Sequence, residues 1–370
     1  MVSTIHVTVD DQVFLLQPRG GISRYFTEVL RQFSSDATLG VSAEVAARWV
    51  RNEHLVEAFP GQYRVPSPWL RRRPLMQFAN RTQRPGSRPD VVHHTHYGAE
   101  ALSRFPGIPR ICTIYDMIPE LMPQEFPDGN PHMLKKRYVE ECDAIICISE
   151  TTRRDLLATY DVGDKPVEVT HLAVSDHFRP SGGPQPKLPD RYVLFIGHRG
   201  GYKNADILMR AMSGVAQQNS DVWTVLVGGG ALTTAESARA ESLGIGDRVL
   251  QIDPPDQDLP DVYAKSAAFV FPSRYEGFGL PVLEALAAGT PALLANTAIF
   301  REVAGTAGVY FDPDDDQQLA SLIDTCLTDR DNRQRLASAG RRRLEEFSWH
   351  RTAQQTAQVY RQLLSGSGKG

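Results

Sequence analysis

The sequence has few cysteines and no long apolar run. Its 370 residues include 4 cysteines, and their spacing forms neither a C-x-x-C pair nor a metal-ligand pattern. Cys112, Cys142 and Cys147 lie inside apolar stretches. We therefore expect buried free thiols rather than a disulfide framework, which fits a reducing compartment.

Targeting and membrane-spanning segments are also missing from the pattern. The first residues, Met-Val-Ser-Thr-Ile-His-Val, lack the basic-then-apolar order of a signal peptide. No apolar stretch approaches the roughly 18 residues of a transmembrane helix. The net charge of −4 argues against a general nucleic-acid binder. We expect a cytoplasmic protein.

Short apolar runs bounded by turn residues alternate with amphipathic stretches, which is typical of βα units on a parallel sheet. The length favours two domains over one core. The predicted strands are 4–9, 43–48, 90–95, 110–115, 143–148, 167–172, 191–196, 222–227, 248–252, 267–271, 292–295 and 308–311. The predicted helices include 21–33, 131–141, 150–160, 315–328, 332–346 and 350–364.

A segment rich in proline and glycine separates two series of such units. It covers residues 179–190 and is predicted to be a linker. The sequence thus predicts an α/β protein with two doubly wound parallel-sheet domains, 1–178 and 191–346. A last helical segment, 347–364, follows, and the tail 365–370 is expected to be disordered. Ligands of such sheets bind beyond the carboxyl ends of the strands.

The most informative stretch is 271–291, Phe-Pro-Ser-Arg-Tyr-Glu-Gly-Phe-Gly-Leu-Pro-Val-Leu-Glu-Ala-Leu-Ala-Ala-Gly-Thr-Pro. A loop that bends at Gly277 and Gly279 precedes a helix predicted to start at Pro281 and to stop near Gly289. A glycine-flanked helix N-terminus favours anions, because unpaired N–H groups and the helix dipole both face the ligand.

Two glutamates, Glu276 and Glu284, lie eight positions apart in this stretch. We expect Glu284 in the first turn of the helix, where its carboxylate suits a neutral hydroxyl pair such as a ribose. Glu276, on the loop, would face the other end of the ligand. The alternative is an acidic helix start plus an exposed loop glutamate, which leaves the glycines, the proline and the spacing unexplained.

This stretch resembles the E-x7-E signature of the retaining glycosyltransferases of family 4, which have the GT-B fold. The resemblance implies two Rossmann-like domains facing a central cleft, with the acceptor on 1–178 and the nucleotide-sugar on 191–346. It also implies that the last helix crosses back to the first domain. In the family's terms, Glu284 would hold the ribose. Glu276 would hold the hexose together with backbone N–H groups of Gly277, Phe278, Gly279 and Leu280.

A basic glycine-rich loop, Ile-Gly-His-Arg-Gly-Gly-Tyr-Lys-Asn (196–204), follows the first strand of the second domain. Cations at a helix start oppose the helix dipole unless an anion is bound, so a merely solvated loop fits poorly. The family uses an Arg directly after the glycine and a later Lys to neutralise the leaving diphosphate. Lys203 matches the Lys. His198 occupies the Arg position and Arg199 follows it; we favour Arg199 because it is always charged.

The first domain has two matching segments. Gly20, Gly21 and Arg24 lie in a loop that resembles the family's first glycine-rich loop on the acceptor side, although tight turns also use paired glycines. Tyr115 and Asp116 end a strand where the family commonly carries His-Asp. Tyr115 can donate a hydrogen bond to a sugar but cannot carry a proton at neutral pH without a large pKa shift. Asp116 has the alternative role of a simple strand-end cap.

Gly228 and Gln251 follow or lie within strands that flank the nucleotide base in the family. Because such contacts come partly from backbone groups, UDP, GDP and dTDP donors all stay open. His93, His94 and His96 suggest a metal site by composition only, since neighbouring residues of a strand point to opposite faces. We predict no metal and no cofactor apart from the nucleotide-sugar itself.

Residues 64–88 carry seven arginines and no acidic residue, interleaved with Trp69, Leu70, Leu75, Met76 and Phe78. Such a segment can hold a protein on the anionic inner face of a membrane. A solvated loop with arginines packed on Trp69 is the alternative.

The resulting prediction is a metal-independent retaining hexosyltransferase that acts on a glycan or lipid-linked acceptor. The segments 20–25 and 200–204 are similar to those of bacterial mannosyl- and rhamnosyltransferases, so we favour GDP-mannose. A GT-B nucleotide-sugar epimerase and a non-catalytic sugar-nucleotide-binding protein remain alternatives. A NAD enzyme fits less well, because neither domain starts with G-x-G-x-x-G and a later acidic residue.

Overall fold

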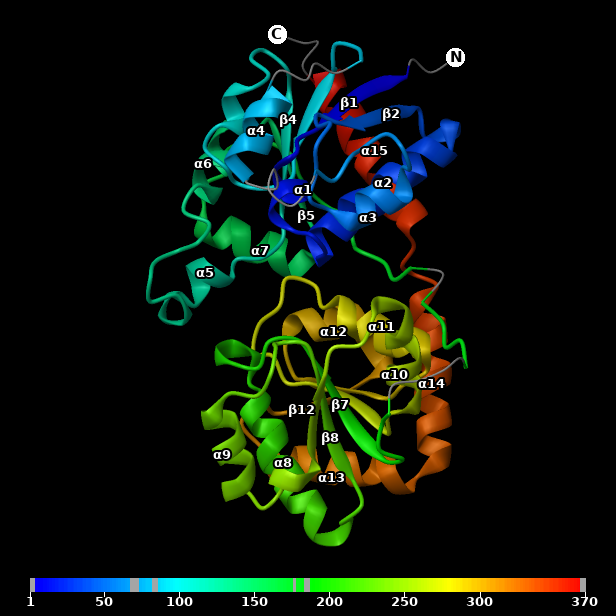
Figure 1. Ribbon diagram of the computed structural model, residues 1–370. Coiled ribbons are helices and arrows are strands. Elements are labelled where there is room, and N and C mark those ends of the chain that lie inside the picture. Colours follow the sequence, from blue (N-terminus) through cyan, green and yellow to red (C-terminus); the bar gives the residue numbers. More distant parts are fainter. Residues whose placement is uncertain (1–3, 67–72, 82–85, 176–177, 183–186, 367–370) are drawn as a thin grey trace. The chain divides into compact units, whose positions relative to one another are not determined.

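The chain divides into two compact units, each built on one parallel sheet. The computed structural model describes residues 4–66, 73–81, 86–175, 178–182 and 187–366 (Figure 1). Unit 1 combines Met1–Leu172 with Ser348–Gly370, and unit 2 is Ala173–Phe347. Each unit has a 6-stranded sheet in which every pairing is parallel. The predicted α/β fold class is confirmed.

The sheet of unit 1 has the strand order β2-β1-β3-β4-β5-β6. Its strands are β1 (Ile5–Val9), β2 (Val41–Val45), β3 (Val91–His94), β4 (Arg110–Ile114), β5 (Ala144–Cys147) and β6 (Val167–Val169). All residues of β3 and β5 are buried. Such continuous burial is expected where helices cover both faces of a parallel sheet, and it explains the apolar runs of the sequence.

Eight α-helices of unit 1 are described, and the last comes from the C-terminal end of the chain. They are α1 (Gln12–Leu16), α2 (Gly21–Ser35), α3 (Glu53–Ala58), α4 (Arg73–Arg81), α5 (Ile118–Leu121), α6 (Lys135–Glu141), α7 (Glu150–Thr159) and α15 (Trp349–Gly366). Helix α15 packs on α2, with the Tyr360 ring 6.1 Å from that of Phe33 (Figure 1). It continues to Gly366, two residues into the predicted tail; 367–370 lie outside the described residues.

The sheet of unit 2 has the strand order β12-β11-β10-β7-β8-β9. Its strands are β7 (Tyr192–Ile196), β8 (Trp223–Val227), β9 (Val249–Ile252), β10 (Ala268–Phe271), β11 (Ala292–Ala295) and β12 (Gly308–Phe311). Its described α-helices are α8 (Ala205–Gln218), α9 (Thr234–Ser242), α10 (Leu259–Lys265), α11 (Leu280–Ala288), α12 (Ala298–Ala304), α13 (Asp316–Thr328) and α14 (Arg330–Leu344). Large rings such as Phe269 and Phe300 are fully buried and fill the core of this unit.

The boundary between the units differs from the predicted one. Contacts divide the chain after Leu172, so 173–178 belong to unit 2. Within the predicted linker, the N–H groups of Ser181 and Gly182 donate to the buried carboxylate of Asp261 at 3.0 and 3.1 Å. The start of the linker is therefore anchored to unit 2, because a buried carboxylate needs such donors.

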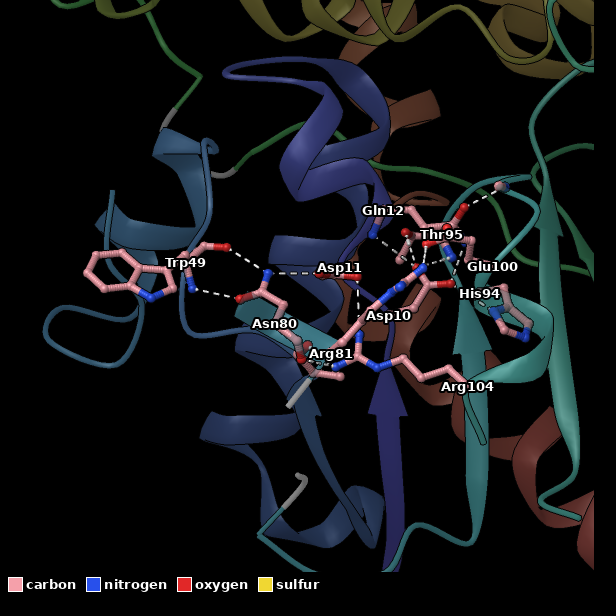
Figure 2. Close-up of polar contacts among 12 residues, drawn as sticks. Asp10, Asp11, Gln12, Trp49, Asn80, Arg81, His94, Thr95, Glu100 and Arg104 are labelled. Atoms are coloured by element: carbon pink, nitrogen blue, oxygen red, sulfur yellow. Dashed lines mark hydrogen bonds and ion pairs between the residues drawn. The ribbon is translucent and has the colours of Figure 1, made fainter. Parts of the chain in front are cut away.

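A helix that the sequence analysis did not predict, α4, lies inside the basic segment 64–88. Figure 2 shows its anchor, Asn80, which is fully buried. The Asn80 amide donates to the Asp11 carboxylate at 2.8 Å and to the Trp49 carbonyl at 2.9 Å. Arg104 donates to the Asn80 carbonyl at 2.6 Å and to Asp11 at 3.3 Å. These bonds dock one face of α4 on unit 1.

A second buried network joins the ends of β1 and β3. The carboxylate of Asp10 lies 2.7 Å from Nδ1 of His94 and accepts from the N–H of Thr95 at 3.0 Å (Figure 2). Burial raises the pKa of Asp10, but the hydrogen bond and the charge of His94 outweigh it and hold that pKa below its ordinary value. The network fixes the relative position of the two loops that follow these strands.

All 4 cysteines are free and buried, as the sequence predicted. No α-helix in the described part of the chain combines the length and apolarity needed to cross a membrane.

The first prediction concerns His93 on β3, whose ring nitrogens contact the Tyr360 and Thr113 hydroxyls, each at 2.8 Å. Burial lowers the pKa of His93 to about 3. An unfolded histidine titrates near pH 6.5. Between the two pKa values the imidazole of His93 is therefore protonated in the unfolded chain but neutral in the folded chain. The free energy of unfolding should therefore fall as the pH drops, by up to about 1.4 kcal/mol per pH unit from this residue.

Urea denaturation at a series of pH values checks this. In the His93→Gln variant, the slope of the free energy of unfolding against pH should be smaller by that amount between about pH 5.5 and 4. Equal slopes in the two proteins would show that His93 is not held neutral.

Candidate functional site

The strongest feature of unit 2 is an ion pair between two loops at the carboxyl edge of its sheet. Nζ of Lys203 lies 2.6 Å from Oε1 of Glu276, and their side chains are only 18% and 12% exposed. Lys203 ends the glycine-rich loop after β7, and Glu276 lies on the loop after β10. Because β7 and β10 are neighbours in the sheet, these loops meet, and the N–H of Arg274 also donates to the Tyr202 carbonyl at 2.8 Å.

Asn204 closes the glycine-rich loop and starts α8. It is the one non-glycine among the described residues with a positive φ, 55°. Asparagine tolerates this left-handed conformation better than most residues. Its amide donates to the Pro313 carbonyl at 2.9 Å, which holds the end of the loop in place.

The second glutamate lies deeper in unit 2. Helix α11 starts at Leu280, one residue before the predicted start, so Glu284 is its fifth residue and not part of the first turn. The carboxylate of Glu284 is buried and accepts from the Tyr263 hydroxyl at 3.0 Å. The helix ends at Ala288, and Gly289 follows with φ 76° as predicted for a C-terminal cap.

The loop before α11 requires glycine at position 279. Gly279 has φ 94°, and a Cβ there would lie 3.2 Å from the Phe300 ring. Phe278 is 2% exposed and its ring packs on Phe347, so its side chain is not available to a ligand. Gly277 and Leu280 border these two residues at the N-terminus of α11.

Arg199 does not point to the Lys203–Glu276 pair. Its guanidinium donates to Glu236 at 2.6 Å and to the Gly228 carbonyl at 2.7 Å, and the side chain is 7% exposed. The sequence-based preference for Arg199 as the diphosphate cation is therefore not supported by this geometry. His198 is exposed, and within the described residues it has no hydrogen bond or ion pair.

Gln251 lies on β9 and is half-buried. Its amide donates to Asp253 at 3.0 Å and to the Ile252 carbonyl at 3.2 Å. These local contacts fix the side chain at the end of the strand. The structure thus places Gly228 and Gln251 on adjacent strand ends, β8 and β9.

In unit 1 the paired glycines lie where α2 begins. Gly20 is the N-cap and Gly21 the first residue of α2, and the N–H of Arg24 donates to the Gly20 carbonyl at 3.0 Å. Asn52 braces this loop, since its buried amide donates to the Gln17 carbonyl at 2.8 Å. The loop after β1 is thereby held at the carboxyl edge of the sheet.

Tyr115 is not offered to a ligand. Its ring is buried, and its hydroxyl donates to the Thr95 carbonyl at 2.8 Å, so the expected contact with a sugar finds no support. Asp116 accepts at 3.0 Å from the N–H of Ile118, the first residue of α5, so its carboxylate stabilises the turn that leads into this helix. Its half-buried carboxylate also lies 3.9 Å from Nζ of the buried Lys135.

Two histidines beside Asp116 form a contact that the sequence did not predict. The rings of His96 and His132 meet edge to face with centroids 5.3 Å apart. Burial, helped by the charge of His132, lowers the pKa of His96 to about 4, and burial also lowers the pKa of His132. Nδ1 of His132 is buried without a hydrogen-bond partner in the described part of the chain. The two histidines are far apart in the sequence, so no local pattern indicates that their rings are in contact.

The histidine run on β3 does not form a metal centre. His93 and His94 point to different partners, Tyr360 and Asp10, as the alternation of a strand requires. No group of three or more His, Cys, Asp or Glu suited to a metal occurs among the described residues.

Comparison with known proteins identifies the family. The family model "Glycosyltransferase Family 4" matches residues 19–178, and "Glycosyl transferases group 1" matches 182–343. The chain belongs to the family 4 glycosyltransferases. This glycosyltransferase is 26% identical to an O-antigen chain mannosyltransferase B of Escherichia coli, over 94% of this chain and 97% of that protein.

Two further similarities mark the breadth of the family. The glycosyltransferase is 30% identical to a D-inositol 3-phosphate glycosyltransferase of Salinispora tropica, over 75% of this chain and 64% of that protein. Its fold is similar to that of a sucrose-phosphate synthase from Thermosynechococcus elongatus, with a TM-score of 0.72, 18% identity, and coverage of 98% and 100%. The fold is GT-B, as predicted.

The Lys203–Glu276 pair yields a prediction about stability. Each charge is largely buried, so Lys203→Met or Glu276→Gln alone leaves the other without its partner and should cost about 1–3 kcal/mol. The double variant should be less destabilised than the sum of the single variants, by about 1 kcal/mol. Chemical denaturation of all four proteins without any ligand measures this coupling. Additive losses would show that the pair contributes nothing as a unit.

Proposed function

We propose that this glycosyltransferase moves a hexose, with retention of anomeric configuration, from a nucleotide-sugar to a glycan or lipid-linked acceptor, and that the donor is GDP-mannose. The Lys203–Glu276 pair at the carboxyl edge of the second sheet carries this proposal. It joins a cation suited to a diphosphate to a carboxylate suited to sugar hydroxyls. The similarity to an O-antigen mannosyltransferase favours mannose over other hexoses.

The donor contacts follow from the loops of unit 2. The ammonium group of Lys203 has three N–H donors, so it would bind the diphosphate and Glu276 at the same time. Glu276 and the backbone N–H groups at the start of α11 would hold the hexose hydroxyls. Glu284, oriented by the Tyr263 hydroxyl, would accept from the ribose hydroxyls.

The chemistry needs charge stabilisation more than a protein nucleophile. The bond between C1 of the sugar and the diphosphate oxygen breaks, and a bond from C1 to the acceptor oxygen forms on the same face. The proton of the acceptor hydroxyl passes to an oxygen of the leaving diphosphate. Lys203 offsets the charge that develops on this group, a type of contact that contributes several kcal/mol to transition-state stabilisation. We propose that this occurs without a metal ion.

The acceptor would bind at the carboxyl edge of the sheet in unit 1. His96 and His132 are half-buried there beside Asp116, and their lowered pKa values keep both rings neutral at physiological pH. A neutral imidazole both donates and accepts, so the pair suits the hydroxyl groups of a sugar. The start of α2 at Gly20 and Gly21 contributes a second polar edge.

Helix α4 supports a peripheral contact with an anionic membrane. Leu75 and Phe78 are 51% and 70% exposed, whereas Met76 and Asn80 are buried against unit 1. Two large apolar side chains thus face outward from a segment that has seven arginines and no acidic residue of its own, although Arg81 pairs with Glu100. This charge favours anionic lipid headgroups, and the apolar pair favours their boundary with the acyl chains. Trp69 and Leu70 of the same segment lie outside the described residues.

The enzymatic proposal is tested with GDP-mannose, UDP- and dTDP-hexoses, each with and without a glycan acceptor. We expect transfer with GDP-mannose and acceptor. Lys203→Ala should lower kcat by about 10²–10³-fold because it removes charge stabilisation in the transition state. Lys265→Ala, an exposed lysine on α10, is the matched control and should be silent. Conversion of a donor without acceptor would favour the epimerase alternative, and a Lys203→Ala variant with the wild-type rate would contradict the site.

The membrane proposal is tested by co-sedimentation with vesicles containing phosphatidylglycerol. The double variant Leu75→Ser/Phe78→Ser should lose about thirtyfold or more in binding, because about 1–2 kcal/mol of apolar burial is lost per residue. Leu157→Ser, which changes another exposed leucine on α7, is the control. Equal binding of all three proteins would remove the membrane role of α4.

A further inference from the structure

A turn of three consecutive glycines links β8 to α9, and all three adopt the left-handed conformation. Gly228, Gly229 and Gly230 have φ values of 78°, 73° and 74°. Other residues rarely adopt this conformation, and never in a run without strain. The turn lies against the loop after β7, since a Cβ on Gly229 would come within 3.1 Å of the Gly197 carbonyl oxygen. It is therefore beside the loop that carries His198 and Lys203.

Arg199 binds the carbonyl side of this turn. Its Nη1 donates to the Gly228 carbonyl at 2.7 Å, and Nη2 donates to the carbonyls of Gly230 and Ala231 at 3.0 and 3.2 Å. The carbonyls of successive residues in the turn therefore point to the same cation. The planar guanidinium has five donors in a fixed fork and matches this arrangement, whereas a lysine would not.

Glu236 completes the assembly from α9. Its carboxylate accepts from Nε of Arg199 at 2.6 Å and from the N–H of Thr233 at 2.7 Å, in the capping box that starts α9. The hydrogen bond from Arg199 is the main reason that the pKa of Glu236 is lowered to about 2. The charge of Arg199 is thus matched locally by a carboxylate and by carbonyl dipoles.

The opposite side of the turn offers donors. The N–H groups of Gly229, Gly230 and Ala231 have no acceptor within the described residues, and all three residues are exposed. Each N–H group lies opposite the carbonyl of the preceding residue across a planar trans peptide. Arg199 binds those preceding carbonyls, on Gly228, Gly229 and Gly230, so the three N–H groups point away from Arg199. Successive backbone N–H groups on one side of a turn can bind an anion.

We propose that Arg199 is a positioning residue that fixes the turn 228–231, and that the N–H groups of Gly229, Gly230 and Ala231 bind the diphosphate of the donor together with Lys203. Arg199 itself makes no contact with the diphosphate. The assignment rests on the proposed function, because it presupposes a nucleoside diphosphate at this edge of unit 2. It adds to that function by assigning part of the diphosphate contact to backbone N–H groups of the turn, and not to the side chain of Arg199.

The binding test compares both ends of the Arg199–Glu236 contact, with GDP as the probe in isothermal titration calorimetry. Glu236→Ala and Arg199→Ala should each weaken GDP binding by about tenfold, the double variant by no more than either alone, and Arg199→Lys should not restore it. Thr233→Ala is the matched control, because it weakens the cap of α9 but leaves the contact of Arg199 intact. Weaker binding in Arg199→Ala with wild-type binding in Glu236→Ala, or rescue by Arg199→Lys, would show a direct ionic contact and overturn the proposal.

A second measurement needs no ligand. Limited proteolysis at the bond between Ala231 and Leu232, followed by mass spectrometry of the nucleotide-free protein, reports the order of the turn. Cleavage should be faster in Arg199→Ala and Glu236→Ala than in the wild type, and unchanged in Lys203→Ala. Equal rates in all proteins would overturn the positioning role. A wild-type protein that binds no nucleoside diphosphate would instead overturn the proposed function, while proteolysis still decides what Arg199 does.

Discussion

The ion pair between Lys203 and Glu276 holds together the two loops that carry the proposed donor site of this glycosyltransferase. Its existence follows from the order of the strands. Strand β7 lies between β10 and β8, so the loops after β7 and β10 leave the same edge side by side although more than sixty residues separate them. One loop brings a cation and the other a carboxylate. Neither charge would be stable so far from water without the other, which ties the fold of the site to its chemistry.

Both units place their polar loops where the strand order reverses direction. In unit 2 the reversal lies between β10 and β7, and in unit 1 between β1 and β3. Open parallel sheets bind ligands at such points, because the loops on either side diverge and leave room at the carboxyl edge. The paired glycines at α2 follow β1, and His96 follows β3. The bond between Asp10 and His94 joins these same two strand ends from below, in the core.

The sequence predicts the strands and the fold well, since every strand found corresponds to a predicted apolar run and the β11 and β12 ranges agree to the residue. Local signals suffice there, because burial on both faces demands continuous apolar residues. Local signals are not sufficient where contacts between distant parts of the chain determine the structure. Helix α4 was missed because its stability depends on Asn80 bonding to Asp11, which is 69 residues away. Tyr115 was expected at a ligand, yet its hydroxyl is used by the Thr95 carbonyl of the neighbouring strand end.

The contrast between Lys203 and Arg199 shows why residue type alone does not assign a role. Both are cations of one short loop, and each pairs with one glutamate at 2.6 Å. Glu276 belongs to the loop before α11, so its pair stays at the carboxyl edge where a donor would bind. Glu236 belongs to the capping box of α9, so its pair is part of the scaffold, and the glycine carbonyls use the remaining donors of Arg199. Permanent charge, the property that favoured Arg199 from the sequence, is also what makes it suited to binding several carbonyls at once. The two cations therefore differ in how many of their N–H donors are already bound within the protein, and this difference separates their proposed roles.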